Sequence, residues 1–393
     1  MAKFIGDLPE GIVTEILFRV PVKSLLQCKS VCKLWLSIIS DPYIIKSHLH
    51  RAISASINNP SALNIEYSPP DEDDQDFIAS TQSILSTLVE CTAEVQLRRR
   101  RPCQPVKGGC LSNVNRQDFS SSPVHFNHLL MPHLFYYSRV ISSYNGIICL
   151  ADYFGRAVYL WNPSIRHFKK LPSVQPYATR SMPVKIGFGY DSISDGYKVF
   201  RIVYENIFDV VPIVQVYSTS ADIWREFRAP ILKNWKIYKQ TSIVVNGVMY
   251  FDGGDELISF DLHKEVFGLV SFPSFIQRKG SDVLDFEGFV AMVFESVDYG
   301  PGLDLWTLDD VSGEMSWTKR FSVEVDSDTN IWLYCYLGAG LFYGRKLMNG
   351  NVFLYDCDEK KETKYFELGE ETSSLTLKYI ETLVSLDGFE QVE

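Results

Sequence analysis

The chain has 393 residues, of which 46% are apolar and 22% are charged, a mixture typical of folded globular proteins. Its formal net charge is −10 and its pI is about 5.3. This balance argues against a nucleic-acid-binding protein, because binding to a phosphate backbone normally requires a basic stripe. The eight cysteines contain no Cys-x-x-Cys pair, so we expect neither a disulfide-stapled mini-domain nor a zinc ribbon.

The beginning of the sequence carries no targeting signal that we can identify. The first twenty residues contain acids and lack a continuous apolar core, so they do not match a secretory signal peptide. No apolar run in the chain approaches the length that spans a bilayer. We therefore expect an intracellular protein, cytoplasmic or nuclear, that does not contact a membrane.

Residues 5–53 are predicted to be helical. Leu8, Ile12 and Ile16 recur at four-residue spacing with Val13 and Leu17 beside them, which is the stripe of an amphipathic helix. A proline at position 21 ends this helix. Such a small module has little volume for its own core, yet it carries many large apolar residues. This excess indicates that part of its apolar surface is meant for a partner.

Further helix starts follow within the same module. A short helix is predicted through residues 25–29, and Ser30 is a candidate N-cap for a third helix over residues 31–38. Asp41 followed by Pro42 is another start signal. Cys28 and Cys32 are four residues apart, and we interpret both as packed residues of the helical module.

Residues 69–122 differ in composition from the rest of the chain. They open with two prolines and an acidic run, and they later contain four consecutive arginines at 98–101. This composition predicts a long, partly disordered insertion. The arginines could form a nuclear-import signal or an anion patch; the alternative is a solvated charge run that pairs with the acidic run upstream.

From about residue 135 onward the sequence predicts strands with an internal repeat. In each copy a strand ends in an aromatic residue and a small polar residue, and a second aromatic follows after a turn. The separation is seven residues in three copies and eleven in two, which we attribute to a longer hairpin loop. The pairs are Trp161 and Phe168, Tyr217 and Trp224, Phe260 and Phe267, Trp306 and Trp317, and Tyr355 and Phe366.

The repeat spacing indicates a β-propeller. The first aromatics of successive copies lie about 43–56 residues apart, which suits four-stranded blades. Asn-Gly pairs at 145–146, 246–247 and 349–350 predict tight turns. Strands over residues 136–142 and 63–67 are further candidates, and a last strand over 379–386 could pair with an N-terminal strand and close the ring. We expect about six blades; a split β-sandwich is the structural alternative.

The first fifty residues resemble an F-box. The resemblance rests on Asp-Leu-Pro at 7–9, Glu-Ile-Leu at 15–17, residues 19–26, residues 29–35 and Asp-Pro at 41–42. The remainder resembles the F-box-associated, kelch-like domain of plant F-box proteins. Its motifs are Leu-Trp-Asn-Pro-Ser at 160–164, Gly-Phe-Gly-Tyr-Asp at 187–191 with 195–199, and residues 216–218, 259–262, 304–306, 316–319 and 379–384. The insertion at 69–122 departs from that pattern.

The resemblance implies a mainly β protein with an N-terminal α module: a three-helix F-box at 1–53 and a β-propeller-like domain at 123–393. The insertion at 69–122, which is predicted from composition alone, separates the two. It also implies a substrate-recognition subunit of an SCF-type (cullin–RING) E3 ubiquitin ligase. Its partners would be a Skp-type adaptor, through it the cullin and RING subunits, and a target protein. The adaptor-facing candidates carried over from the F-box are Leu8, Pro9, Ile12, Ile16, Leu17, Leu25, Leu26, Val31, Cys32 and Trp35.

No catalytic constellation is visible in the sequence. His125, His128 and His133 lie close together, but even with Cys110 they match no standard metal-ligand spacing. Nucleophile-elbow, P-loop and dinucleotide motifs are absent from the sequence. We expect a non-catalytic protein with no metal and no cofactor. The alternative function is an interaction or glycan-binding propeller without a ligase role; exposed loops at 177–182, 206–212 and 298–304 are candidate recognition segments.

Overall fold

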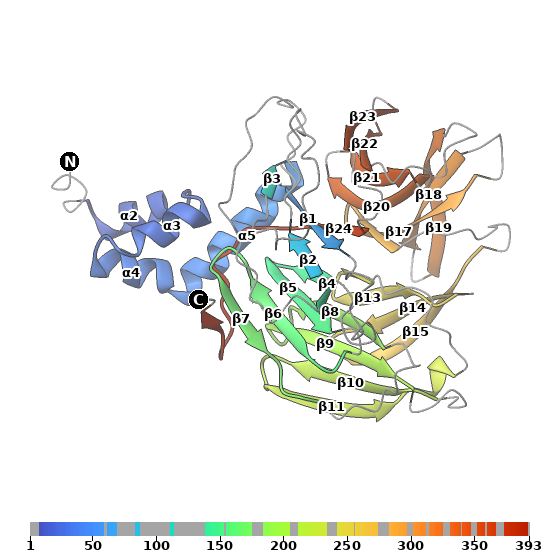
Figure 1. Cartoon of the computed structure of the whole chain (residues 1–393), viewed down its shortest axis with the longest axis horizontal. Helices are drawn as coiled ribbons and strands as arrows, with labels where there is room; N and C mark the ends of the chain where they lie inside the picture. The colour runs from blue at the N-terminus through green and yellow to red at the C-terminus, as the bar shows by residue number, and fades with distance from the viewer. Residues whose placement is uncertain are drawn as a thin grey trace.

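Helices at one end and a ring of sheets at the other make up the molecule (Figure 1). The computed structural model describes residues 8–58, 61–68, 83–86, 111–113, 138–152, 155–174, 184–204, 211–233, 242–254, 256–273, 283–296, 302–311, 314–324, 331–338, 340–346, 352–357, 360–366 and 373–391. Within these residues no helix combines the length and the apolar character needed to cross a bilayer. Most of the insertion predicted at 69–122 lies outside the described residues.

The helical module contains α2 (Glu10–Leu17), α3 (Val22–Cys28), α4 (Lys33–Ser40) and α5 (Pro42–Asn58). The start signal at Asp41 is confirmed, because its Oδ1 accepts a hydrogen bond from the Tyr43 amide at 2.8 Å. The Ser30 cap was predicted wrongly. Ser30 instead lies in the turn that follows α3, where its hydroxyl donates to the Gln27 carbonyl at 2.7 Å, and Cys32 is the N-cap of α4 without a side-chain hydrogen bond.

The helix predicted to start at Asp41 and Pro42 is a fourth helix, in addition to the three attributed to the F-box. Helix α5 has 17 residues, and it runs from the other helices to the first strand of the propeller (Figure 1). His48 connects it to the segment between α2 and α3, since its Nε2 lies 3.2 Å from the Val20 carbonyl oxygen. Burial lowers the pKa of His48, although the hydrogen bond to Val20 opposes this shift, so the ring is neutral at pH 7 and donates through Nε2.

Five sheets are antiparallel meanders in which each strand pairs with the next. The first joins β4 (Ser138–Tyr144), β5 (Ile147–Asp152), β6 (Val158–Asn162) and β7 (His167–Lys170). The second and third hold β8 (Lys185–Asp191), β9 (Gly196–Val203), β10 (Ile213–Ser218) and β11 (Ile223–Arg228), then β12 (Ile243–Val245), β13 (Val248–Asp252), β14 (Glu256–Asp261) and β15 (Val266–Ser271). The fourth and fifth hold β16 (Val283–Phe286), β17 (Phe289–Glu295), β18 (Gly302–Val311) and β19 (Glu314–Glu324), then β20 (Ile331–Gly338), β21 (Leu341–Lys346), β22 (Val352–Asp356) and β23 (Lys361–Phe366).

A sixth sheet is assembled from both ends of the chain. Strand β24 (Ser373–Lys378) pairs with β1 (Ser61–Ser68), and the short strands β2 (Ser83–Ser86) and β3 (Leu111–Asn113) pair with β1. The ring is therefore closed by a C-terminal strand against an N-terminal one, but by residues 373–378 and not by 379–386. Residues 379–386 form no strand; they lead to β25 (Glu390–Gln391), which extends the first sheet beside β7.

The propeller has five regular blades, where about six were expected. The first strands of the sheets follow one another around the ring, with contacts between β4 and β8, β8 and β12, β12 and β16, β16 and β20, β20 and β24, and β24 and β4. The sixth position is occupied by the composite sheet, whose strands come from distant parts of the chain. A meander repeat in sequence could not reveal this sheet, because it is not a meander.

In three of the five copies the repeated aromatics are cross-strand neighbours on the third and fourth strands of a blade. Trp161 lies opposite Phe168, and Tyr217 lies opposite Trp224; such pairs stabilise a sheet. The prediction of a longer hairpin loop in the fourth and fifth copies was wrong. Strands β18 and β19 are themselves longer, and Trp306 lies opposite Lys319 while Trp317 lies opposite Leu308. In the fifth copy Tyr355 lies opposite Glu362, the same separation of seven residues as in the first three copies.

Short turns gather on one face of the propeller. They join the first to the second strand and the third to the fourth strand of each meander, and the antiparallel order places both sets at one end. The predicted turn at Asn145 and Gly146 is confirmed, since φ is positive at both (51° and 77°), as a type I′ turn requires. The pair at 246–247 behaves in the same way, while the pair at 349–350 lies outside the described residues.

The helical module packs on this short-turn face. Ile165 of the β6–β7 turn and Leu383 of the C-terminal segment join the apolar cluster that forms the core of the helices. On α5, Lys46 Nζ lies 2.9 Å from Oδ2 of Asp195 in the β8–β9 turn. The two parts of the molecule are thus joined by apolar packing as well as by the chain itself.

Candidate docking surface

Helix α2 is apolar on two sides. Val13 and Leu17 are each 2% exposed and face the core of the helical module. Ile12 and Ile16 are 49% and 48% exposed on the outside. A helix on the surface of a globular protein ordinarily shows one apolar stripe and a polar outer face. The second stripe on α2 therefore lacks the partner that burial would provide.

Exposed apolar residues are concentrated on the helical module. Among the described residues, half of the large apolar side chains that are exposed lie within residues 8–43, and the other half are distributed over the propeller. A density of this kind is typical of a surface that binds another protein. The residues on the module are Leu8, Ile12, Ile16, Val31, Leu34, Leu36 and Tyr43.

The ten candidates from the sequence fall into three groups. Leu8, Pro9, Ile12, Ile16, Val31 and Cys32 are exposed. Leu26 and Trp35 are half-buried against the core of the module. Leu17 and Leu25 are buried within that core. The last two support the helices from inside, so in this conformation they present no surface to a partner.

Three exposed residues were missed by the sequence reasoning. Leu34, Leu36 and Tyr43 lie on α4 and at the start of α5. Leu34 was assigned only to a helix, and the other two were not singled out for contact. Helical spacing separates only Leu36 from the buried Ile38. Leu34 lies one turn before Ile38, on the same side of α4, so its exposure could not be read from the sequence.

The charged groups beside α2 make local contacts. Arg19 pairs with Glu15 one turn earlier, and both side chains are more than half exposed. Such a surface pair contributes little to stability. The exposed apolar stripe, and not a charged site, is therefore the distinguishing feature of this surface.

Few of the described residues are relevant to metal binding or to nucleophilic chemistry. Within the described ranges no group of three or more His, Cys, Asp or Glu side chains is placed to hold a metal ion. The candidates Cys110, His125, His128 and His133 lie outside those ranges. Cys28 and Cys32 are both free thiols, the first half-buried and the second exposed.

Comparison with known protein families matches both parts of the chain. The model for the F-box associated beta propeller domain matches residues 105–363, which is more than half of the sequence. The chain belongs to this family. The F-box domain model matches residues 5–47, the helices that carry the exposed apolar stripe.

Several proteins of Arabidopsis thaliana are similar to this F-box protein over most of its length. "F-box/kelch-repeat protein At3g23880" is 25% identical over 89% of this chain and 88% of its own length. "Putative F-box protein At3g52320" is 26% identical over 93% and 88%, and "F-box protein CPR1" is 22% identical over 91% and 83%. Among solved structures, a chain of a nidogen/laminin complex has a TM-score of 0.38 at 11% identity, covering 70% of this chain and 97% of that chain; a likeness this low supports no argument.

The Gly-Phe-Gly-Tyr-Asp motif of the F-box-associated domain joins two blades. Asp191 lies 3.4 Å from Lys198 Nζ, and both side chains are almost fully buried. Lys198 also reaches Glu265 at 2.9 Å in the β14–β15 turn of the next blade. Burial alone would raise the pKa of Asp191, but hydrogen bonds, led by that from Ser194, lower it to about 2. These motif residues thus stabilise the propeller and are not exposed for recognition.

Proposed function

We propose that this F-box protein is the substrate-recognition subunit of an SCF-type (cullin–RING) ubiquitin ligase. Its F-box docks a Skp-type adaptor, the adaptor connects it to the cullin and RING subunits, and the propeller captures the target protein. The observation that carries the proposal is the unpartnered outer face of α2, with Ile12 and Ile16 about half exposed. The family relationship supplies the class of partner.

The contact set that we propose is narrower than the sequence prediction. It consists of the exposed residues Leu8, Pro9, Ile12, Ile16, Val31 and Cys32, to which the structure adds Leu34 as a candidate. Apolar surface removed from water on docking contributes about 25 cal/mol per Å² before the costs of association. A few central apolar side chains usually carry most of such binding energy.

The decisive experiment compares adaptor binding by two matched double variants. Ile12→Asp/Ile16→Asp places charges on the outer face of α2. Ile223→Asp/Ile231→Asp changes two isoleucines on the propeller that are also exposed, at 54% and 41%. Binding to a purified Skp-type adaptor is measured by calorimetry, and folding is checked by circular dichroism.

We expect the α2 variant to lose at least 100-fold in affinity, because two charges would be buried without partners, and we expect the propeller variant to bind like wild type. Equal binding by both variants would refute the docking surface. A wild-type chain that does not bind the adaptor at all would favour the alternative of an interaction or glycan-binding propeller without a ligase role.

In this proposal the chain contributes specificity and no catalytic residue. Holding a target lysine near an activated thioester raises the effective concentration of the reacting groups. That function requires a fixed geometry between the F-box and the propeller. The packing of Ile165 and Leu383 into the helical core supports such a geometry.

We further propose that the target binds the propeller face opposite the F-box. The F-box packs against the short turns, whereas the second and fourth strands of each meander end at the other face. The connections at 171–184, 204–212 and 296–301 leave from those ends, and they include or overlap the three recognition segments predicted from sequence. Loops on a rigid scaffold commonly carry binding residues.

Targets can be sought by affinity purification with the proteasome inhibited. The Ile12→Asp/Ile16→Asp variant keeps the propeller intact but is expected to uncouple it from the ligase. Proteins that accumulate on this variant relative to wild type are candidate targets; if no protein accumulates, the target-receptor role is contradicted. Such complexes operate in the cytoplasm or nucleus in this proposal, and fluorescence microscopy of the tagged chain tests that location.

A further inference from the structure

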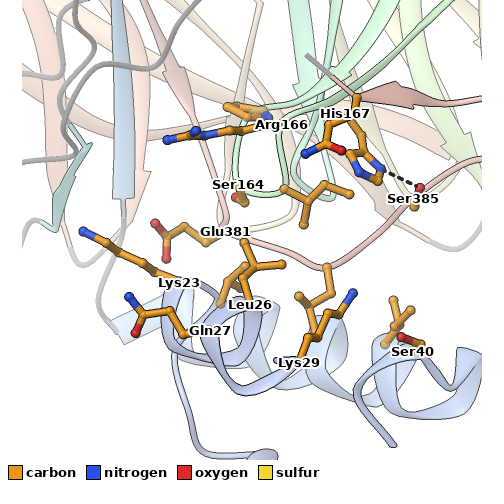
Figure 2. Close-up of a pocket in the computed structure, with 16 residues that line it drawn as sticks. Lys23, Leu26, Gln27, Lys29, Ser40, Ser164, Arg166, His167, Glu381 and Ser385 are labelled. Carbon is orange, nitrogen blue, oxygen red and sulfur yellow. Dashed lines mark hydrogen bonds between the residues drawn. The ribbon is translucent and has the colours of Figure 1, made fainter. Parts of the chain in front are cut away.

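A pocket of about 820 Å³ lies at the seam between the F-box and the propeller. Its walls come from α3 and the start of α5 on one side, and from the β6–β7 turn and the C-terminal segment on the other. Figure 2 shows Leu26 and Lys29 extending from the helical side toward Arg166, His167 and Glu381 on the propeller side. Its volume is within the range of small-molecule sites.

The charged groups of the pocket are mainly cationic. Lys23, Lys29 and Arg166 line it, whereas Glu381 is the one carboxylate among the lining residues. This local balance is opposite in sign to the formal charge of −10 on the whole chain. A positive pocket on an acidic protein favours an anion at that position over the rest of the surface.

Two of these cations have no carboxylate partner in the part of the chain that the structure describes. Neither Lys29 nor Arg166 forms an ion pair with a carboxylate among the described residues. Burial lowers the pKa of Lys29, which means that its charge is partly removed from water without a compensating partner. Its charge also helps burial to lower the pKa of His167, so the two side chains face the same space.

The carboxylate in the pocket only partly offsets this charge. Burial raises the pKa of Glu381 to about 7, against the opposing attraction of Lys23. Its negative charge is therefore weakened near neutral pH. An anion entering the pocket meets two unpaired cations and a weakened negative charge.

The remaining lining is largely apolar. Val22, Leu26 and Ile45 come from the F-box, and Ile165 and Leu383 come from the propeller side. Ligand sites in proteins typically combine such walls with a few polar groups that orient the ligand. We propose that this seam binds a small molecule with an apolar body and one anionic head group, a carboxylate, sulfonate or phosphate, held by Lys29 and Arg166. A ligand here contacts both domains and strengthens their connection.

The test uses two probes that share an apolar body and differ in charge. 1-Anilinonaphthalene-8-sulfonate carries a sulfonate, and N-phenyl-1-naphthylamine is its uncharged counterpart. Both become fluorescent in apolar surroundings, so titration of the full chain gives an affinity and a stoichiometry for each. We expect one saturable site per chain and at least tenfold tighter binding of the anionic probe.

Matched variants assign the site. Lys29→Gln/Arg166→Gln removes the two unpaired cations, and Lys33→Gln/Lys233→Gln removes two exposed lysines that do not line the pocket. We expect the first variant to bind the anionic probe roughly tenfold more weakly and the uncharged probe unchanged, and we expect the second to behave like wild type. The proposal is overturned if binding is not saturable, if the uncharged probe binds equally well, or if both variants weaken binding alike. None of these results depends on the adaptor.

Discussion

The side-chain amide of Asn162 donates a hydrogen bond of 2.8 Å to the carbonyl of Val384. Asn162 belongs to the Leu-Trp-Asn motif at the end of β6, and a second bond of 3.1 Å to the Thr382 carbonyl fixes the other side of Leu383. The side chain of Leu383 is buried in the core of the F-box helices. A motif of the propeller thus holds the residue on which the F-box packs.

Truncation of Leu383 should loosen the F-box from the propeller. Leu383→Ala removes apolar contacts from the shared core and should lower the free energy of unfolding by about 2–5 kcal/mol. The adjacent Val384 packs against the propeller core instead, so Val384→Ala is the matched control. Limited proteolysis and small-angle scattering should report a separated F-box only in the first variant. Identical cleavage rates and scattering profiles for the two variants would contradict the anchoring role of Leu383.

Substitutions on the two faces of α2 should have different effects on the free energy of unfolding. Leu17→Ala leaves a cavity in the core of the module and should cost about 2–5 kcal/mol in unfolding free energy. Ile16→Ser changes an exposed side chain and should alter stability by no more than about 0.5 kcal/mol. Urea denaturation measures both. A destabilisation by Ile16→Ser as large as that by Leu17→Ala would mean that the outer face is already packed within the chain.

Glu381 should make the protein less stable as the pH rises. Burial raises its pKa from the ordinary value of 4.5 to about 7, so the folded state keeps a proton that the unfolded state loses between these values. Stability therefore falls as the pH rises from about 4.5 to 7, by up to about 3 kcal/mol, and remains low above that window. Glu381→Gln should remove this contribution and stabilise the chain at pH 8.

The control for this pH dependence is Glu390→Gln, which changes an exposed carboxylate near the end of the chain. Thermal unfolding is measured between pH 5 and 8 for both variants and for wild type. A wild-type slope that persists unchanged in Glu381→Gln would assign the pH dependence to another group.

Asp191→Asn should weaken the junction between two blades. The substitution leaves Lys198 buried with Glu265 as its remaining charged partner. Loss of one member of a buried charge cluster is costly because the desolvated charge that remains is less compensated, and we expect a loss of about 2–4 kcal/mol at pH 7. Asp387→Asn, an exposed change, serves as the control in denaturant titrations. A neutral effect of Asp191→Asn would show that Glu265 alone compensates Lys198.

Local sequence determined the elements of this protein and much of its architecture. The aromatic residues at 161, 217, 260, 306 and 355 all lie on the third strands of the meander blades, because a blade is built from contacts between sequence neighbours and its pattern repeats along the chain. The turn at 145–146 was predictable for the same reason, since a two-residue turn depends only on the residues within it.

Tertiary structure decided what depends on residues far apart in the chain. Ile12 and Ile16 have the same apolar character as Val13 and Leu17, and only the position of the other helices and of Leu383 shows which pair is buried. The pairing of β1 with β24 joins segments separated by about 300 residues, and the seam pocket exists only where α3 meets the β6–β7 turn. The hydrophobic effect favours the burial of an apolar side chain, but it does not specify which surface buries that side chain. That surface is determined by the folded chain and its partners.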